Sequence, residues 1–175
     1  MTTDQHDSPG AVTWVVMGVS GCGKSQVGAR LAVRLSVPFI EGDAFHSPAN
    51  VDKMSAGVAL NDNDRHDWLL ALRDQIARHA SQGVVLGCSS LKRAYRDVLR
   101  SGAADVRFAH LAGSRALLTE RMQHRPGHYM PLSLLDSQLA TLEPLQPDEA
   151  GITLDIRETI EQLAERIVCA DGQRG

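Results

Sequence analysis

The fold of this chain is decided by residues 12–25, which read Val12-Thr13-Trp14-Val15-Val16-Met17-Gly18-Val19-Ser20-Gly21-Cys22-Gly23-Lys24-Ser25. The first six are a short apolar, β-rich run, which is typical of a buried strand. The rest match the pattern G-x-x-x-x-G-K-S. They open a helix expected over residues 24–35, in which Val27, Leu31 and Leu35 recur on one face. A strand, this glycine-rich loop and a helix in that order predict a phosphate-binding loop.

The loop has the residues that a nucleoside triphosphate site needs. Its glycines let backbone N–H groups turn inward at the positive end of the following helix. Lys24 is expected to reach the β- and γ-phosphates as a catalytic group, and the Ser25 hydroxyl to ligate Mg²⁺. We interpret Cys22 as a small side chain rather than a redox switch. The predicted nucleotide-binding residues in this region are Gly18, Ser20, Gly21, Cys22, Gly23, Lys24, Ser25 and Gln26.

Strands and helices are predicted to alternate along the rest of the chain. Further strands are expected over residues 37–40, 83–87, 106–111 and 152–155. Helices are expected over residues 48–57, 64–79, 91–99, 114–123 and 132–142, and after residue 155. This alternation predicts an α/β fold: one domain whose five-stranded parallel sheet has helices on both faces.

Capping signals define the expected ends of several helices. Ser47 before Pro48 and Ser114 are predicted N-caps. Asp155, with Glu158 three positions later, is predicted to cap the final helix.

Composition bounds the classes of function. A length of 175 residues suits one domain. A net charge of −3 argues against a nucleic-acid partner, and no apolar run is long enough to span a membrane. Residues 1–10 are polar, so we expect a disordered tail rather than a signal peptide, and residues 171–175 are expected to be a flexible end. Three dispersed cysteines indicate a reducing cytoplasm.

The remaining motifs separate the classes of nucleotide-binding protein. A GTPase would carry an Asn-Lys-x-Asp motif, which the chain lacks. An AAA-type ATPase would end a strand in an acidic pair, whereas the strand over residues 83–87 leads into Cys88-Ser89-Ser90. These differences favour a small-molecule kinase.

Two acidic residues follow the predicted strand over residues 37–40. Glu41 and Asp43 are two positions apart, so both carboxylates are expected to face one site at the carboxyl end of the strand. Asp43 is predicted to accept the proton of an attacking hydroxyl, and Glu41 to support the Mg²⁺ shell. The alternative for Asp43 is that it caps a turn at Gly42.

Longer motifs extend the pattern over about residues 12–168. They comprise Met17–Ser25, Glu41–His46, Asn50, Lys53-Met54, Gly57, Leu60–Arg65, Trp68-Leu69, Cys88–Lys92, Tyr95-Arg96-Asp97, Arg121, Arg125, Gly127-His128-Tyr129 and Leu142-Glu143. In these residues the chain resembles the gluconokinases, a branch of the shikimate-kinase-like P-loop enzymes. The resemblance implies ATP- and Mg²⁺-dependent phosphorylation of D-gluconate at its 6-hydroxyl. It also implies a three-layer P-loop domain over residues 11–170, a sheet in the order 2-3-1-4-5, a small lid over about residues 121–133, and frequently a homodimer.

The substrate side needs cations for the gluconate carboxylate and hydrogen-bonding groups for its hydroxyls. Arg65 resembles the substrate-clamping arginine of the shikimate-kinase-like group. A cation is disfavoured at a helix start, so a function in binding explains its position. The other predicted substrate-binding residues in this half of the chain are Asp43, His46, Lys53, Ser89, Lys92 and Arg96. For Lys53, Lys92 and Arg96 a solvated surface position is the alternative, and His46 could instead flank a helix.

The lid is expected to supply further groups. Arg121 and Arg125 lie one helical turn apart and are predicted to bind the ATP phosphates, with Arg125 acting in catalysis. An ordinary basic helix end is the alternative. His128 is expected to contact gluconate, although Pro126 and Met130-Pro131 depart from the family pattern.

Two other functions stay open from the sequence alone. One is a kinase of the same fold that acts on shikimate or another small hydroxy acid or polyol. The other is a regulatory protein that binds ATP without a small substrate.

Overall fold

The structure is a computed structural model that describes residues 11–125 and 131–173. Within these residues one parallel sheet runs in the order β2-β3-β1-β4-β5. Its strands are β1 (Thr13–Met17), β2 (Phe39–Glu41), β3 (Val84–Gly87), β4 (Val106–Ala112) and β5 (Gly151–Asp155). The predicted α/β fold and the strand order implied by the resemblance are both confirmed.

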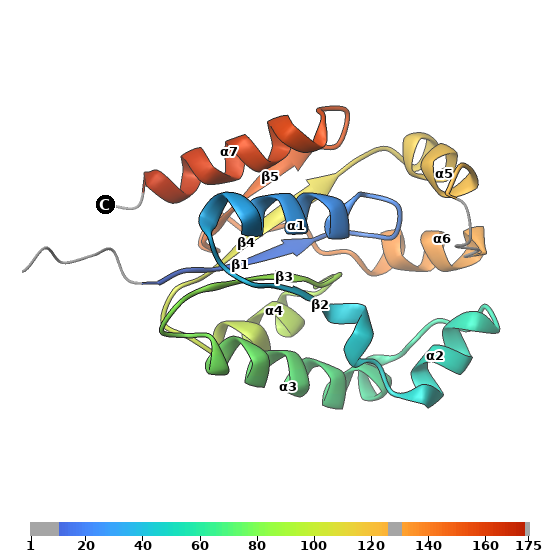
Figure 1. Ribbon diagram of the computed structural model, residues 1–175. Helices are drawn as coiled ribbons and strands as arrows, with labels where there is room; N and C mark the ends of the chain where they lie inside the picture. The colour runs from blue at the N-terminus through green and yellow to red at the C-terminus, as the bar shows by residue number, and fades with distance from the viewer. Residues whose placement is uncertain (1–10, 126–130, 174–175) are drawn as a thin grey trace, which may run out of the picture.

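Helices cover both faces of the sheet (Figure 1). One face is covered by α1 (Lys24–Leu35) and α7 (Ile160–Gly172), and the other by α3 (Asp62–Arg78) and α4 (Arg93–Arg100). All of β1 is buried, as expected for the central strand of a parallel sheet with two covered faces. The three layers are therefore confirmed. None of the described helices is long and apolar enough to cross a membrane.

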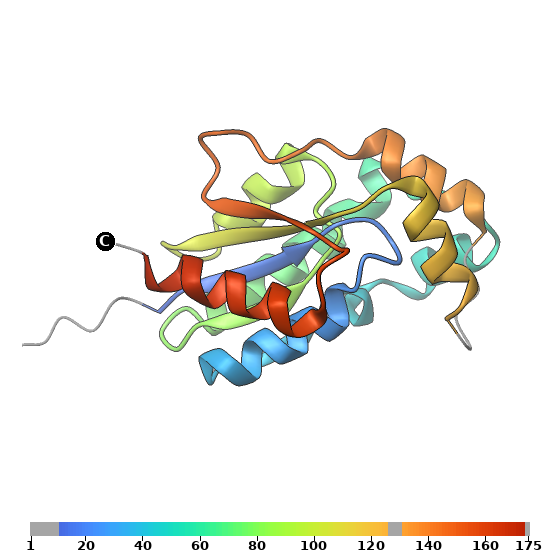
Figure 2. The same ribbon diagram turned by 90° about the horizontal axis from the view of Figure 1, so that it is seen from above.

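The remaining elements gather beyond the carboxyl ends of the strands (Figures 1 and 2). They are the 3₁₀-helix η1 (Gly42–Phe45) and the helices α2 (Pro48–Ser55), α5 (Arg115–Gln123) and α6 (Leu132–Thr141). Ligands of open α/β sheets bind at this edge. The candidate site therefore lies at this end of the sheet, and short helices surround it.

Two predicted caps are confirmed and one is wrong. The side chains of Ser47 and Ser114 accept hydrogen bonds from the third residue of their helices. The last helix starts later than expected, because Thr159 and not Asp155 forms its capping box. Asp155 ends β5 and accepts a hydrogen bond from the backbone N–H of Arg157 at 2.9 Å. The carboxylate that resembled a cap therefore closes a turn.

Candidate active site

The glycine-rich loop between β1 and α1 has an open concave surface. Gly21 and Gly23 have φ angles of 84° and 95°, a left-handed conformation that glycine adopts without strain. Gly23 is the N-cap of α1 and offers no side chain to the first N–H groups of the helix. A Cβ atom built on Gly23 would meet nothing within 4 Å. Unsatisfied N–H groups facing open space at a helix N-terminus fit a phosphate group.

The side chains of Lys24 and Ser25 contact the loop and the end of β2. The Nζ atom of Lys24 donates to the carbonyl oxygens of Gly18 at 3.0 Å and Val19 at 3.1 Å, so the ammonium group lies over the loop. The Ser25 hydroxyl donates to the carboxylate of Glu41, which ends β2. A hydroxyl and a carboxylate oxygen side by side are hard oxygen donors of the kind that Mg²⁺ prefers.

Mg²⁺ in kinases is held by one or two carboxylates and by the substrate phosphates. The described residues contain no group of three or more His, Cys, Asp and Glu side chains that could hold a metal without such help. Ser25 and Glu41 therefore fit a metal that binds together with the nucleotide.

A cavity of about 320 Å³ lies beside the loop. It brings together six of the residues predicted for the site, namely Ser20, Lys24, Asp43, His46, Arg65 and Ser89. These residues come from the loop after β1 and the start of α1, from η1 and the turn after it, from α3 and from the loop after β3. The nucleotide side and the substrate side of the predicted site thus share one cavity.

Asp43 reaches the cavity for a reason other than the predicted one. The strand ends at Glu41, so the two-residue period of a strand does not extend to Asp43. The 3₁₀-turn instead directs Asp43 into the site. This turn packs tightly on the end of β3, where a Cβ atom at Gly42 would lie 2.3 Å from the carbonyl oxygen of Gly87. The Asp43 side chain is 74% exposed, which leaves it open to a substrate.

His46 is held by stacking. Its ring lies on the indole of Trp68 with centroids 4.1 Å apart, and the Trp68 Nε1 donates to the carbonyl oxygen of Gly42 at 2.8 Å. The Nε2 atom of His46 is 4.0 Å from the Asp43 carboxylate. Burial lowers the pKa of His46 in spite of this carboxylate, so the ring is a neutral hydrogen-bonding group at neutral pH.

Arg65 is fixed at the rim of the cavity by the start of α4. Its Nη1 atom donates to the hydroxyl of Tyr95 at 3.1 Å, and the Tyr95 hydroxyl donates to Asp62. Asp62 also accepts from Lys92 at 3.0 Å. Hydrogen bonds from Tyr95 and then Lys92 lower the pKa of Asp62, so this carboxylate stays ionised beside the two cations.

Two lysines that were predicted to bind substrate form ion pairs and do not line the cavity. Lys53 lies 3.0 Å from both carboxylate oxygens of Asp64, and Lys92 pairs with Asp62. Their role in binding gluconate stays a prediction.

The prediction that Arg96 binds substrate is wrong. Its side chain is fully buried and forms an ion pair with Glu149, at 2.7 Å from Nε to Oε1 and 2.9 Å from Nη2 to Oε2. Its remaining donors are taken by backbone carbonyl groups. The guanidinium group therefore has no donor left for a ligand.

The predicted nucleotide contacts of the lid lie at the edge of the described chain. Arg121 donates to the carbonyl oxygen of Ile156 at 2.5 Å, and Arg125 is exposed two residues after the end of α5. Gln26 is exposed on α1, whereas Cys22 is buried in the loop. His128 falls outside the described residues. The roles of these residues stay predictions.

Sequence reasoning missed the wall that α6 contributes to the cavity. Leu134, Ser137 and Gln138 line it, and Trp68 was expected only in the core. Positions 134, 137 and 138 share one face of a helix, so their spacing was a usable signal. Nothing in the local sequence says which neighbour that face covers.

Comparison with known proteins places this chain in a family. A family model described as an AAA domain matches residues 14–145. A gluconokinase of Gluconobacter oxydans is 47% identical over 156 residues, covering 88% of each chain. Among solved structures, a sugar kinase from Janibacter sp. has a TM-score of 0.89 at 46% identity, covering 94% of this chain and 96% of the other. A gluconokinase from Sinorhizobium meliloti has a TM-score of 0.86 at 44% identity, covering 93% and 92%.

The match to the AAA-domain model is a match to a P-loop domain, and the class of small-molecule kinase predicted from the sequence is confirmed by the gluconokinase relatives. Strand β3 leads into Cys88-Ser89-Ser90 without the acidic pair of an AAA-type ATPase. Identity of 44–47% to these gluconokinases extends over most of both chains. The chain belongs to the gluconokinase family of P-loop proteins.

Proposed function

We propose that this protein is a gluconokinase, which transfers the γ-phosphoryl group of ATP to the 6-hydroxyl of D-gluconate. The observation that carries the proposal is that Lys24, Asp43 and Arg65 line one cavity next to the phosphate-binding loop. This arrangement offers a site for phosphate, a base and a cation for an acid group. The similarity to gluconokinases supports gluconate as the acid.

In the proposed reaction Arg65 binds the gluconate carboxylate, because a guanidinium group matches a carboxylate with two parallel hydrogen bonds. The 6-hydroxyl then points toward the loop, where Asp43 accepts its proton. The oxygen forms a bond to the γ-phosphorus while the bond from that phosphorus to the β–γ bridging oxygen breaks. The products are 6-phosphogluconate and ADP, and Lys24 stabilises the charge on the phosphate oxygens.

Ser25 and Glu41 would hold Mg²⁺ with the nucleotide. The metal supplies positive charge that offsets the charge developing on the β- and γ-phosphate oxygens. We further propose that Arg121 and Arg125 of a lid over residues 121–133 add charge on the nucleotide side, with Arg125 as a catalytic group, and that His128 contacts gluconate.

On the same family grounds we propose a single kinase domain over residues 11–170, between a disordered tail at 1–10 and a flexible end at 171–175. We also propose a homodimer in the cytoplasm. Sedimentation of the purified protein would measure the oligomeric state, and a monomer at micromolar concentration would contradict the dimer.

A panel of acceptors tests the proposed activity. ADP release is measured with D-gluconate, shikimate, related sugar acids and no acceptor. We expect release with gluconate to exceed that with every other acceptor. Faster release with shikimate would favour the related hydroxy-acid kinase. Release that no acceptor increases would favour an ATP-binding regulatory protein.

A further inference from the structure

Helix α6 forms a wall of the cavity between the nucleotide side and the substrate side. Leu134, Ser137 and Gln138 lie on the face of this helix that lines the cavity. The same cavity is lined by Ser20 and Lys24 of the loop and by Asp43. A side chain on this face of α6 can therefore contact the loop and a substrate together.

Gln138 contacts the phosphate-binding loop directly. Its Oε1 atom accepts a hydrogen bond from the backbone N–H of Ser20 at 2.8 Å. A backbone N–H only donates, so the amide oxygen must face the loop and the amide nitrogen must face away from it. Among residues 11–125 and 131–173 the Nε2 atom has no hydrogen-bond partner. The contact thus leaves two donor hydrogens on a side chain that lines the cavity.

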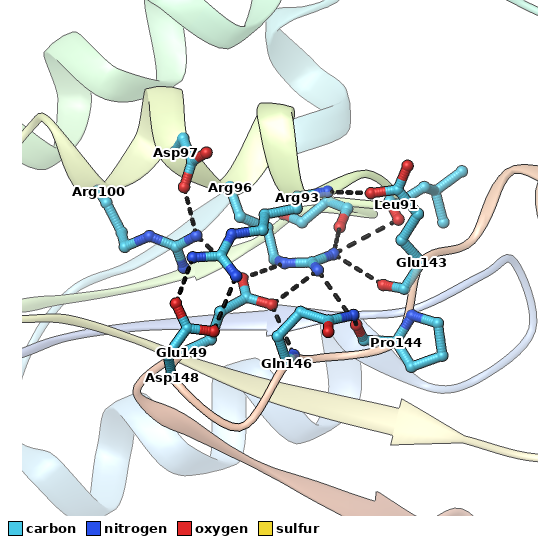
Figure 3. Close-up of polar contacts among 11 residues, drawn as sticks. Leu91, Arg93, Arg96, Asp97, Arg100, Glu143, Pro144, Gln146, Asp148 and Glu149 are labelled. Atoms are coloured by element: carbon cyan, nitrogen blue, oxygen red, sulfur yellow. Dashed lines mark hydrogen bonds and ion pairs between the residues drawn. The ribbon is translucent and has the colours of Figure 1, made fainter.

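The segment that follows α6 is anchored to the core by buried Arg96 (Figure 3). Buried Arg96 donates to the carbonyl oxygens of Ser90 and Glu143, both at 3.0 Å. The backbone N–H of Glu143 donates to the carbonyl oxygen of Leu91 at 2.7 Å. These bonds tie the segment after α6 to the loop after β3. Arg96 therefore has a structural role next to the cavity that it does not line.

The position of Gln138 along the cavity indicates which part of the acceptor it meets. An attacking oxygen must approach to about 3–3.5 Å from the phosphorus atom. A residue bonded to Ser20 is therefore near the reacting end of the acceptor. Gluconate is a chain of six carbons, and its carboxylate lies at the end opposite to the reacting hydroxyl. Arg65 is expected to bind that carboxylate.

We propose that Gln138 is a substrate-binding residue that donates a hydrogen bond from Nε2 to the hydroxyl at carbon 5, next to the phosphorylated one. Its Oε1 atom keeps the contact with Ser20, so one amide aligns the acceptor with the loop. This assignment rests on the proposed function. It adds a contact that recognises the polyol chain to those proposed for Arg65, Asp43 and His128.

The test compares Gln138→Ala with the wild-type enzyme on gluconate and on 5-deoxygluconate. We expect the variant to raise the KM for gluconate about tenfold, the loss of roughly one hydrogen bond, with the KM for ATP unchanged. For the wild type, 5-deoxygluconate should be poorer than gluconate by a similar factor. For the variant the two acceptors should have equal KM, because the partner of the hydroxyl is gone.

Asp136→Ala is the matched control. Asp136 lies on the exposed side of α6 and pairs with Arg115 at 2.6 Å, so its removal disturbs the helix without changing the cavity. We expect this variant to have wild-type KM values for both acceptors. A similar rise in the KM for gluconate would attribute the effect to α6 as a whole and overturn the assignment.

Other outcomes are equally decisive. A Gln138→Ala enzyme with a wild-type KM for gluconate overturns the assignment and leaves the proposed function intact. A rise in the KM for ATP without one for gluconate would show that Gln138 serves only the loop, and also overturns it. A wild-type enzyme that does not phosphorylate gluconate removes the proposed function and this assignment with it.

Discussion

At the scale of single residues, Asp43 decides whether the cavity is a catalytic site. Its carboxylate is exposed in the cavity that Lys24 and Arg65 also line. We predict that Asp43→Asn lowers kcat by at least about 100-fold, because the amide cannot accept the proton of the attacking hydroxyl. The KM for ATP should change little, since Asp43 lies on η1 and outside the loop that we propose binds the phosphates.

Steady-state kinetics at varied ATP and gluconate measure both quantities. Asp52→Asn, an exposed carboxylate on α2, serves as the control and should keep wild-type kinetics. A kcat within about threefold of wild type for Asp43→Asn would remove Asp43 from the mechanism.

His110 gives a prediction about pH and stability. This residue of β4 is 4% exposed, and its Nδ1 atom has no hydrogen-bond partner among the described residues. Burial, and then the nearby charges of Arg96 and Lys24, lower its pKa to about 4. The unfolded chain therefore binds a proton below about pH 6.5 that the folded protein does not, and stability falls as the pH drops from 6.5 to 4.

The variant His110→Leu isolates this contribution. Over that pH range the wild type should lose up to about 3 kcal/mol more unfolding free energy than the variant, since the leucine has no proton to bind. Urea denaturation at pH 7, 6, 5 and 4 measures the difference, in which the carboxylates common to both proteins cancel. Parallel curves for the two proteins would refute the assignment of this slope to His110.

At the scale of elements, the Arg96–Glu149 pair holds α4 to the segment before β5 (Figure 3). Burial alone would raise the pKa of Glu149. Hydrogen bonds from Arg96, the backbone N–H of Gln146 and Arg100 outweigh burial and lower this pKa to about 2. The carboxylate is thus charged at neutral pH, and removing its partner leaves a buried charge uncompensated.

We predict that Arg96→Met costs about 3–5 kcal/mol of unfolding free energy for this reason. Arg93, three residues earlier on α4, pairs with Asp148 on the surface, and Arg93→Met should cost less than about 1 kcal/mol. Urea unfolding of the two variants makes the comparison. An equal cost for both would contradict the structural role of the buried pair.

The sequence predicted elements well where local patterns define them. Ser47 and Ser114 were identified as caps because a cap depends on residues three apart. The prediction that Asp155 caps the last helix failed because Thr159, four residues later, forms the capping box instead. The prediction that Arg96 binds substrate failed because its partner Glu149 is 53 residues away in the sequence. A local sequence pattern cannot indicate a pair so far apart.

At the scale of the whole molecule, the strand order followed from the family resemblance, whereas the alternation of elements already predicted the fold class and helices on both faces of the sheet. The loop from Gly18 to Ser25 was predictable because its chemistry is continuous in sequence. The cavity was predictable only in part. Gln138 joins it through a contact with Ser20 across 118 positions, which exists only once α6 packs over the loop.

The central claim is that phosphate leaves the loop for the 6-hydroxyl of gluconate. It is tested most directly by ³¹P NMR of ATP, Mg²⁺ and D-gluconate incubated with the wild-type protein. We predict one new phosphate monoester, at carbon 6 of gluconate, for each ADP formed, and no inorganic phosphate above background. ADP that appears together with inorganic phosphate alone, or no consumption of ATP when gluconate is added, would contradict the claim.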